Sequence, residues 1–187
     1  SALYSQTTPL IVDHRVSTLS TFESIPAAYI TAAKTNLHIA YEHTSHGQQL
    51  VEGMTGLVNW KGSTYAFNTG GTGGALDLRD HAIAKLFSCW GMDLGNTRCP
   101  DNEQYYLWAT NTRTYLATNP GVNVVIWSWC GQLSYATDAN VDQYLSLMNQ
   151  LEIDYPNITF IYMTGHVDQW QKAPTGRVYL NNQRIRN

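Results

Sequence analysis

Two stretches of the chain are apolar at almost every position, and both predict buried β-strands. They are VNVVIWSW at 122–129 and ITFIYMT at 158–164. A strand with one solvent-exposed face alternates apolar and polar residues, whereas a strand that is buried on both faces is apolar throughout. Shorter stretches at 37–42 and 64–67 predict two further strands, which come earlier in the chain.

Between these strands, apolar residues recur at the spacing of helices. Residues 46–59 have apolar side chains at Leu50, Val51, Met54, Leu57 and Val58. Further helices are predicted at 25–35, 79–88, 102–118, 141–155 and 178–186. Strands that alternate with helices predict a parallel sheet with helices on both faces. The predicted fold class is therefore α/β, a three-layer α/β/α sandwich with a mainly parallel sheet, formed by a single domain at 1–187.

The composition narrows the setting in which the protein acts. Hydrophobic residues make up 43% of the chain and charged residues only 13%, with six Trp and twelve Tyr. Such a low charged share is typical of an extracellular protein that contacts carbohydrate, and equally of a large core under an uncharged surface. The net charge of −3 without a basic patch argues against nucleic acid as a partner. No apolar run approaches the roughly 18 residues of a membrane span.

Three cysteines add an expectation about the compartment. Cys89 and Cys99 flank a loop-like segment, which predicts a disulfide bond in a secreted protein. Cys130 lies in the apolar run VVIWSWC and is expected to be a buried free thiol. The chain begins at SALYSQTTPL without a basic and apolar leader, so we expect a secreted, extracellular protein whose signal peptide has been removed.

Polar or glycine-rich segments follow all four predicted strands. They are EHTSHG after 37–42, NTGGTGG after 64–67, CGQLS after 122–129 and GHVDQ after 158–164. In open α/β sheets, ligands bind beyond the carboxyl ends of the strands, so these segments are expected to form the functional site. Ser45 then lies at a strand-to-helix turn. A serine there is either a nucleophile whose backbone N–H faces an oxyanion or an ordinary helix cap.

The order of these segments resembles that of the SGNH, or GDSL-type, hydrolases over roughly residues 36–170. That family consists of flavodoxin-like esterases and deacetylases that act on small acyl esters, often on carbohydrate. The resemblance implies a strand order of 2-1-3-4 and Ser45 as the nucleophile. It also implies an oxyanion hole formed by the N–H groups of Ser45 and Gly70 and by the side chain of Gln132. The family's Gly-Asp-Ser is absent here, and so is its Asp-x-x-His block, since the chain ends at Asn187 before any fifth strand is predicted.

A serine nucleophile needs a neighbouring base. His166, in the segment after the fourth predicted strand, is the preferred candidate, with Asp168 to orient its ring. His43 and His46 are secondary candidates, although both flank the serine and are expected to point away from it. The third source is a histidine beyond the end of the given chain.

The sequence thus predicts a secreted serine esterase or carbohydrate O-deacetylase. Its substrate is expected to be a small acyl ester or an acetylated glycan, with no cofactor and no metal ion. A metal site formed by His43, His46, His166 and Asp168 is a weaker interpretation, because no known zinc signature is present. The alternative is a non-catalytic extracellular surface or assembly protein on the same fold, which forms homo-oligomers through its Tyr and Trp residues. Its fourth predicted strand would then be a sheet edge that needs a cover.

Overall fold

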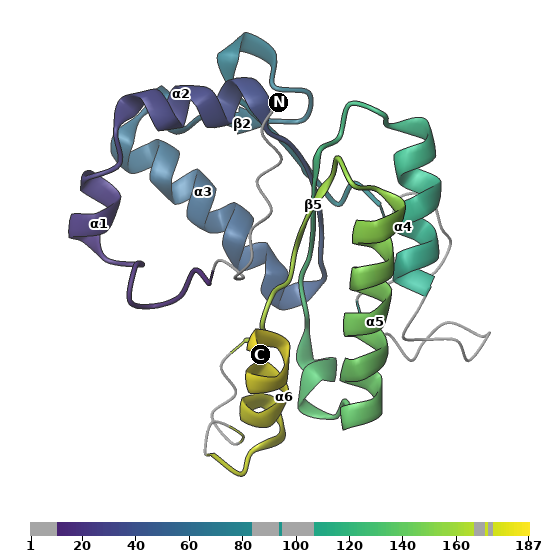
Figure 1. The fold of residues 1–187 in the computed structure, drawn as a ribbon. Helices are drawn as coiled ribbons and strands as arrows, with labels where there is room; N and C mark the ends of the chain where they lie inside the picture. Colours follow the sequence, from purple (N-terminus) through teal and green to yellow (C-terminus); the bar gives the residue numbers. More distant parts are fainter. Residues whose placement is uncertain (1–10, 84–93, 95–106, 167–170, 172–173) are drawn as a thin grey trace.

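The computed structural model describes residues 11–83, 94, 107–166, 171 and 174–187. Its centre is a five-stranded, all-parallel sheet with the order β2-β3-β1-β4-β5 (Figure 1). The strands are β1 (His38–Glu42), β2 (Phe67–Asn68), β3 (Leu76–Asp80), β4 (Val124–Trp127) and β5 (Thr159–Ile161). The predicted α/β class with a parallel sheet is confirmed.

Helices cover both faces of the sheet, which gives the three layers visible in Figure 1. They are α1 (Leu19–Glu23), α2 (Ala27–Asn36), α3 (Gln48–Lys61), α4 (Leu107–Thr118), α5 (Asp138–Asp154) and α6 (Arg177–Arg186). The first three lie on one side of the sheet and α4 and α5 on the other, while α6 packs near the start of α5 (Figure 1). None of the helices in the described part of the chain is long and apolar enough to cross a membrane.

Alternate residues of the central strands face the two helical layers. Ala40, Val125 and Trp127 belong to the core beside α4 and α5, whereas Tyr41 and Ile126 belong to the core beside α3. All five are buried, so both faces of β1 and β4 are covered. Double burial is the arrangement that the continuous apolar run around β4 predicts.

The helix predicted at 79–88 is wrong at its beginning, because residues 76–80 form β3. The remainder of that range, from residue 84, lies outside the described residues. β3 pairs with β1 over four positions, and within it Asp77 forms an ion pair of 2.9 Å with Arg79. The strand was not predicted because these two charged residues interrupt the apolar pattern, although they neutralise each other in the folded protein.

The observed strands β3, β1, β4 and β5 lie side by side in this order. This is the predicted order 2-1-3-4 when β3 is counted as the second strand. The segment 64–67, predicted as the second strand, instead spans the end of the 3-10 turn η2 (Ser63–Tyr65) and the start of the two-residue β2. β2 lies at one edge of the sheet, where it pairs with β3. β5 forms the opposite edge of the described sheet, as predicted for the fourth strand.

Candidate active site

β1 leads directly into the turn that carries Ser45. The strand ends at Glu42, and Ser45–Gly47 form the 3-10 turn η1 before α3 begins at Gln48. Ser45 is exposed and has a φ of 31°, within the left-handed region that costs an L-residue about 1–2 kcal/mol. Strain of this kind persists where the surrounding structure imposes it, and it clusters at active sites. Ser45 is therefore presented at the carboxyl edge of the sheet in a conformation that an ordinary helix cap does not need.

Tyr41 and Gly47 hold this turn against the end of the strand. The hydroxyl of the buried Tyr41 donates a hydrogen bond of 2.8 Å to the carbonyl of Gly47. Burial raises the pKa of Tyr41, so the hydroxyl stays protonated and remains a donor at neutral pH. Gly47 itself lies so close to His43 that an added Cβ would meet the His43 Cβ at 2.2 Å. The turn is thus packed tightly against Tyr41 and His43.

The loops after β1, β4 and β5 meet at His46. Its Nδ1 lies 3.3 Å from the Sγ of Cys130, which follows β4. Its ring stacks on the ring of His166, with centroids 4.0 Å apart and planes 9° apart. His166 follows β5, so the fold brings it across β4 to the turn that carries Ser45. The base that the sequence favours therefore lies against the residue next to Ser45.

A small pocket opens between these loops. Its volume is about 170 Å³, and its lining includes Tyr41, His46, Trp129, Met163 and His166. Sites for drug-sized ligands usually measure roughly 300–1,000 Å³, so this pocket suits a group of few heavy atoms. The lining combines Leu50, Trp129 and Met163 with the polar side chains of Gln49, Ser128 and Thr164 beside the two imidazoles.

Gln132 lies on the 3-10 turn η5 (Gly131–Ser134), which follows β4. Its Oε1 is buried and has no hydrogen-bond partner among the described residues. A flip of the carboxamide exchanges Oε1 with Nε2, so this position accepts or donates. The turn is held in place by the buried Asn181 of α6, whose amide donates to the carbonyls of Leu133 at 2.8 Å and Ala136 at 2.9 Å. A fixed, unsatisfied amide is stabilised by a ligand that supplies its partner.

Gly70 lies away from Ser45. Its N–H donates a hydrogen bond of 2.8 Å to Asp77 of β3, and Asp77 is level with His38 at the beginning of β1. Four residues of strand separate this level from the end of β1, a distance of roughly 13 Å. The amide that the resemblance assigns to the oxyanion hole is instead used at the opposite end of the strand. The reason is that β2 is shorter than predicted and ends level with Asp77.

Asp77 is the centre of a separate buried network. Burial opposes its ionisation, but hydrogen bonds from Arg79, Gly70 and His38 lower the pKa of Asp77 to about 2. The same pairing raises the pKa of Arg79. Asp77 and Arg79 neutralise each other's charge in this network, so we assign the network to the stability of the fold.

His43 and His46 have different neighbours. The Nε2 of the buried His43 lies 2.9 Å from Asp80, and its ring lies 4.1 Å from that of His81. His46 faces Cys130 and His166 instead. The metal site interpreted from His43, His46, His166 and Asp168 is therefore not assembled by the histidines that the structure describes.

Three of the predicted residues, Asp168, Cys89 and Cys99, lie outside the described part of the chain. Cys130 has a free thiol, as predicted, but it is partly exposed instead of buried. Its position beside His46 is a functional signal that the sequence analysis missed. The pair Asp80 and His81 was missed too, and it becomes visible in the sequence only when β3 is recognised, because both residues lie at the end of that strand.

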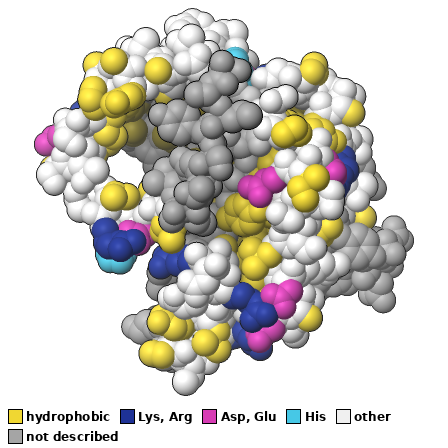
Figure 2. Space-filling model, viewed as in Figure 1, with side chains coloured by type: hydrophobic (Ala, Val, Ile, Leu, Met, Phe, Trp, Pro, Cys, Tyr) yellow, Lys and Arg dark blue, Asp and Glu magenta, His cyan; other side chains and the backbone are white. Residues whose placement is uncertain are grey.

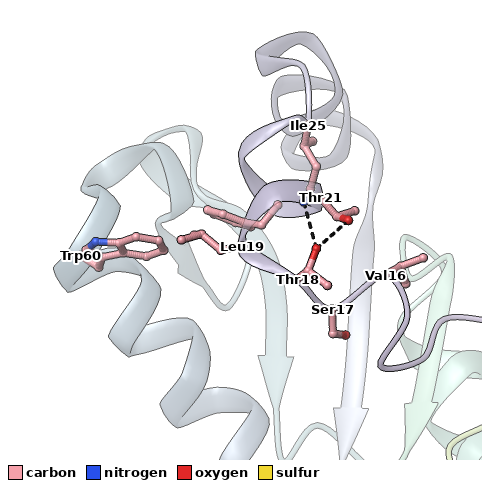
Figure 3. Close-up of a pocket in the computed structure, with 8 residues that line it drawn as sticks. Val16, Ser17, Thr18, Leu19, Thr21, Ile25 and Trp60 are labelled. Carbon is pink, nitrogen blue, oxygen red and sulfur yellow. Dashed lines mark hydrogen bonds between the residues drawn. The ribbon is translucent and has the colours of Figure 1, made fainter.

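A larger pocket, of about 370 Å³, lies between α1 and the end of α3. Figure 3 shows Leu19 and Trp60 pointing toward each other, with Thr18 hydrogen-bonded to Thr21 beside them. Its lining carries no acid, base or thiol, so it offers no acid–base chemistry. In Figure 2, hydrophobic side chains gather at this end of the molecule, over α1, α2 and the end of α3.

Comparisons with protein-family models, with curated proteins and with solved structures find no match to this chain. The case for any function therefore rests on the residues of the site itself.

Proposed function

We propose that the protein is a serine-type ester hydrolase whose site lies at the carboxyl edge of the sheet, between the loops after β1, β4 and β5. The observation that supports this most is the conformation of Ser45, an exposed serine with a φ of 31° on a turn beside two stacked imidazoles. The energetic cost of that conformation is understandable if it presents the hydroxyl to a substrate.

In the proposed reaction, the Ser45 hydroxyl attacks the acyl carbon and passes its proton to an imidazole. His166 is the proposed base, because it comes from the loop after β5 to the turn that carries Ser45, where its ring stacks on that of His46. The backbone N–H of Ser45 and the carboxamide of Gln132 stabilise the oxyanion. The protonated base then donates to the leaving alkoxide, and water hydrolyses the acyl-enzyme by the reverse proton transfers.

The pocket beside the two imidazoles supports a small acyl group as the substrate's reacting part. Its volume of about 170 Å³ is enough for an acetyl group or a short acyl chain and too small for a drug-sized ligand. The remainder of the substrate would lie outside the pocket, on a protein with only 13% charged residues and 12% aromatic residues. This composition supports an acetylated glycan, and an extracellular setting, as the more specific proposal.

The test is turnover of p-nitrophenyl acetate together with labelling by a serine-reactive fluorophosphonate. We expect Ser45→Ala to abolish both, whereas Ser146→Ala, which changes an exposed serine in the middle of α5, leaves both unchanged. We expect His166→Ala to lower turnover by at least a hundredfold, in line with the loss of a general base. A phosphonate adduct on any residue other than Ser45, or full turnover in Ser45→Ala, would contradict the proposal.

Cys130 is the competing nucleophile within the same site. Its Sγ lies 3.3 Å from the Nδ1 of His46, and a thiol beside an imidazole is the usual arrangement of a cysteine nucleophile. Under the serine proposal, Cys130→Ala keeps most of the turnover and iodoacetamide inhibits only weakly. Loss of turnover in Cys130→Ala, with Ser45→Ala still active, would move the nucleophile to the thiol and keep the site.

The second candidate function is assembly, and the apolar surface around the larger pocket favours it. Leu19, Ile25, Tyr29 and Trp60 are all exposed there, with Tyr29 at 69% and Trp60 at 58%. A contiguous apolar patch of this kind is typical of a protein contact, and a second copy of this chain is the simplest partner. Light scattering after size exclusion tests it: a stable dimer that Trp60→Glu dissociates, in a protein without esterase turnover, would favour assembly over hydrolysis.

A further inference from the structure

Three potential metal ligands converge at the carboxyl ends of the neighbouring strands β1 and β3. His43 follows β1, Asp80 ends β3 and His81 follows it. The Nε2 of His43 lies 2.9 Å from Oδ1 of Asp80, and one ligand atom from each of the three residues lies within 4.8 Å of the other two. A tetrahedral ion with bonds of about 2.0–2.1 Å needs its ligand atoms roughly 3.3 Å apart. Small side-chain rotations therefore suffice to bring the three atoms onto one ion.

The backbone of His81 has a strained conformation at this position. Its φ of 50° lies in the left-handed region, which costs a non-glycine residue roughly 1–2 kcal/mol. Its Nδ1 faces Oε1 of Glu42 at 3.2 Å, and Glu42 is fully buried, with its other oxygen accepting the N–H of Ile83 at 2.8 Å. A carboxylate behind one nitrogen of a histidine is the usual support of a metal ligand, since it orients the ring and leaves the other nitrogen free.

The second histidine is buried, and it is only partly satisfied. His43 is 1% exposed, and its Nδ1 has no hydrogen-bond partner among the described residues. In contrast, the side chains of Asp80 and His81 are 33% and 44% exposed. The cluster therefore has one deep ligand and two at the surface, which leaves an entry path and a solvent-facing position.

We propose that His43, Asp80 and His81 bind a divalent transition-metal ion of the Zn²⁺ class. Two imidazole nitrogens and one carboxylate oxygen form a donor set that zinc favours, and three protein ligands leave the fourth position to water. This site is separate from the one proposed for ester hydrolysis and does not rest on it, because it shares no residue with that site: His46 contacts Cys130 and His166 instead.

The other end of the same two strands supplies a matched control. His38 lies 3.0 Å from Asp77, so a histidine–aspartate pair of the same kind joins β1 and β3 there. Asp77, however, is already neutralised by Arg79, at 2.9 Å. A cation has no reason to replace the guanidinium, and we expect no metal at this pair.

The experiment measures Zn²⁺ binding to the full chain after treatment with EDTA and buffer exchange, by calorimetry and by competition with a chromogenic chelator. We expect one Zn²⁺ per chain in the wild type and in His38→Ala. We expect His81→Ala and the isosteric Asp80→Asn each to weaken binding at least tenfold, and circular dichroism to show that both stay folded. Co²⁺ substitution gives a second readout, because a visible absorption band of tetrahedral type is expected and should disappear in the same two variants.

The outcomes separate cleanly. No saturable binding of Zn²⁺ or Co²⁺ by the wild type overturns the proposal. So does binding that His81→Ala and Asp80→Asn leave unchanged, or binding that His38→Ala removes, since either result places the ion elsewhere.

Discussion

Replacing Ser45 by glycine and by alanine separates the cost of its backbone conformation from the chemistry of its hydroxyl. Both changes remove the oxygen, so both are expected to abolish ester hydrolysis. Alanine keeps a Cβ at a φ of 31° and with it the strain of about 1–2 kcal/mol, whereas glycine is free of it. Glycine gives back roughly 0.5–1 kcal/mol through the greater freedom of the unfolded chain. The net expectation is that Ser45→Gly is more stable than Ser45→Ala by about 0.5–1 kcal/mol.

Urea unfolding followed by tryptophan fluorescence resolves a difference of this size, provided that the slopes of the two transitions agree. The same pair of changes at Ser146, in the middle of α5, is the control. There the backbone is helical, and alanine should be the more stable by about 0.8–1 kcal/mol. The sign of the difference should thus invert between the two sites. A Ser45→Gly variant that is no more stable than Ser45→Ala would refute the argument that strain is stored at this turn.

Two further predictions concern the surroundings of the site. Gly47→Ala should destabilise the protein by about 1–3 kcal/mol in thermal or urea unfolding, because the new Cβ would lie 2.2 Å from the buried side chain of His43. Gly56→Ala in α3 is the control, since its new Cβ meets nothing within 4 Å. We expect Gly56→Ala to stabilise the protein by about 0.5–1 kcal/mol in the same assay. Asp77→Asn should cost about 2 kcal/mol at neutral pH, because the pKa of Asp77 is lowered from 3.8 to about 2. A lowered pKa stabilises the fold above pH 4, and this stabilisation is lost as the pH falls toward 2. The difference in free energy of unfolding between wild type and Asp77→Asn should therefore shrink at acid pH. A difference that does not change with pH would contradict the reasoning.

The sequence reveals those parts of the fold that are built from uncharged residues. The strand around 122–129 is recognisable because both faces of β4 are covered and all four residues of β4 are apolar. The apolar run at 158–164 also contains a strand, but double burial is wrong for it, because β5 buries Phe160 and leaves Thr159 and Ile161 exposed. β3 is not recognisable, because Asp77 and Arg79 within it satisfy each other, and a pattern of single residues does not show that two charges will meet. This one omission also explains the misplacement of the second strand in the sheet.

The candidate site follows the same division. Ser45 and His166 were expected at one edge because both follow parallel strands, and the stacking of His166 on His46 is consistent with that topology. The contact between His46 and Cys130 was not foreseeable, since it depends on the directions of two side chains from loops 84 residues apart. Gly70 was misjudged because its role depended on the length of β2, and a two-residue strand leaves little signal in a sequence.

The turn at Ser45–Gly47 links the two proposed sites mechanically. His43 lies beneath it, since a Cβ on Gly47 would reach the His43 side chain, while Ser45 and His46 lie on it. An ion bound to His43 would therefore hold in place the side chain that packs against the turn of Ser45, although the ion and the substrate contact different residues. The Cβ added by Gly47→Ala would push His43 and the turn apart, so we expect this variant to lower both zinc affinity and ester turnover in protein that remains folded. Loss of turnover with zinc affinity intact would show that His43 does not move with the turn, and that the two sites are coupled only by their place on β1.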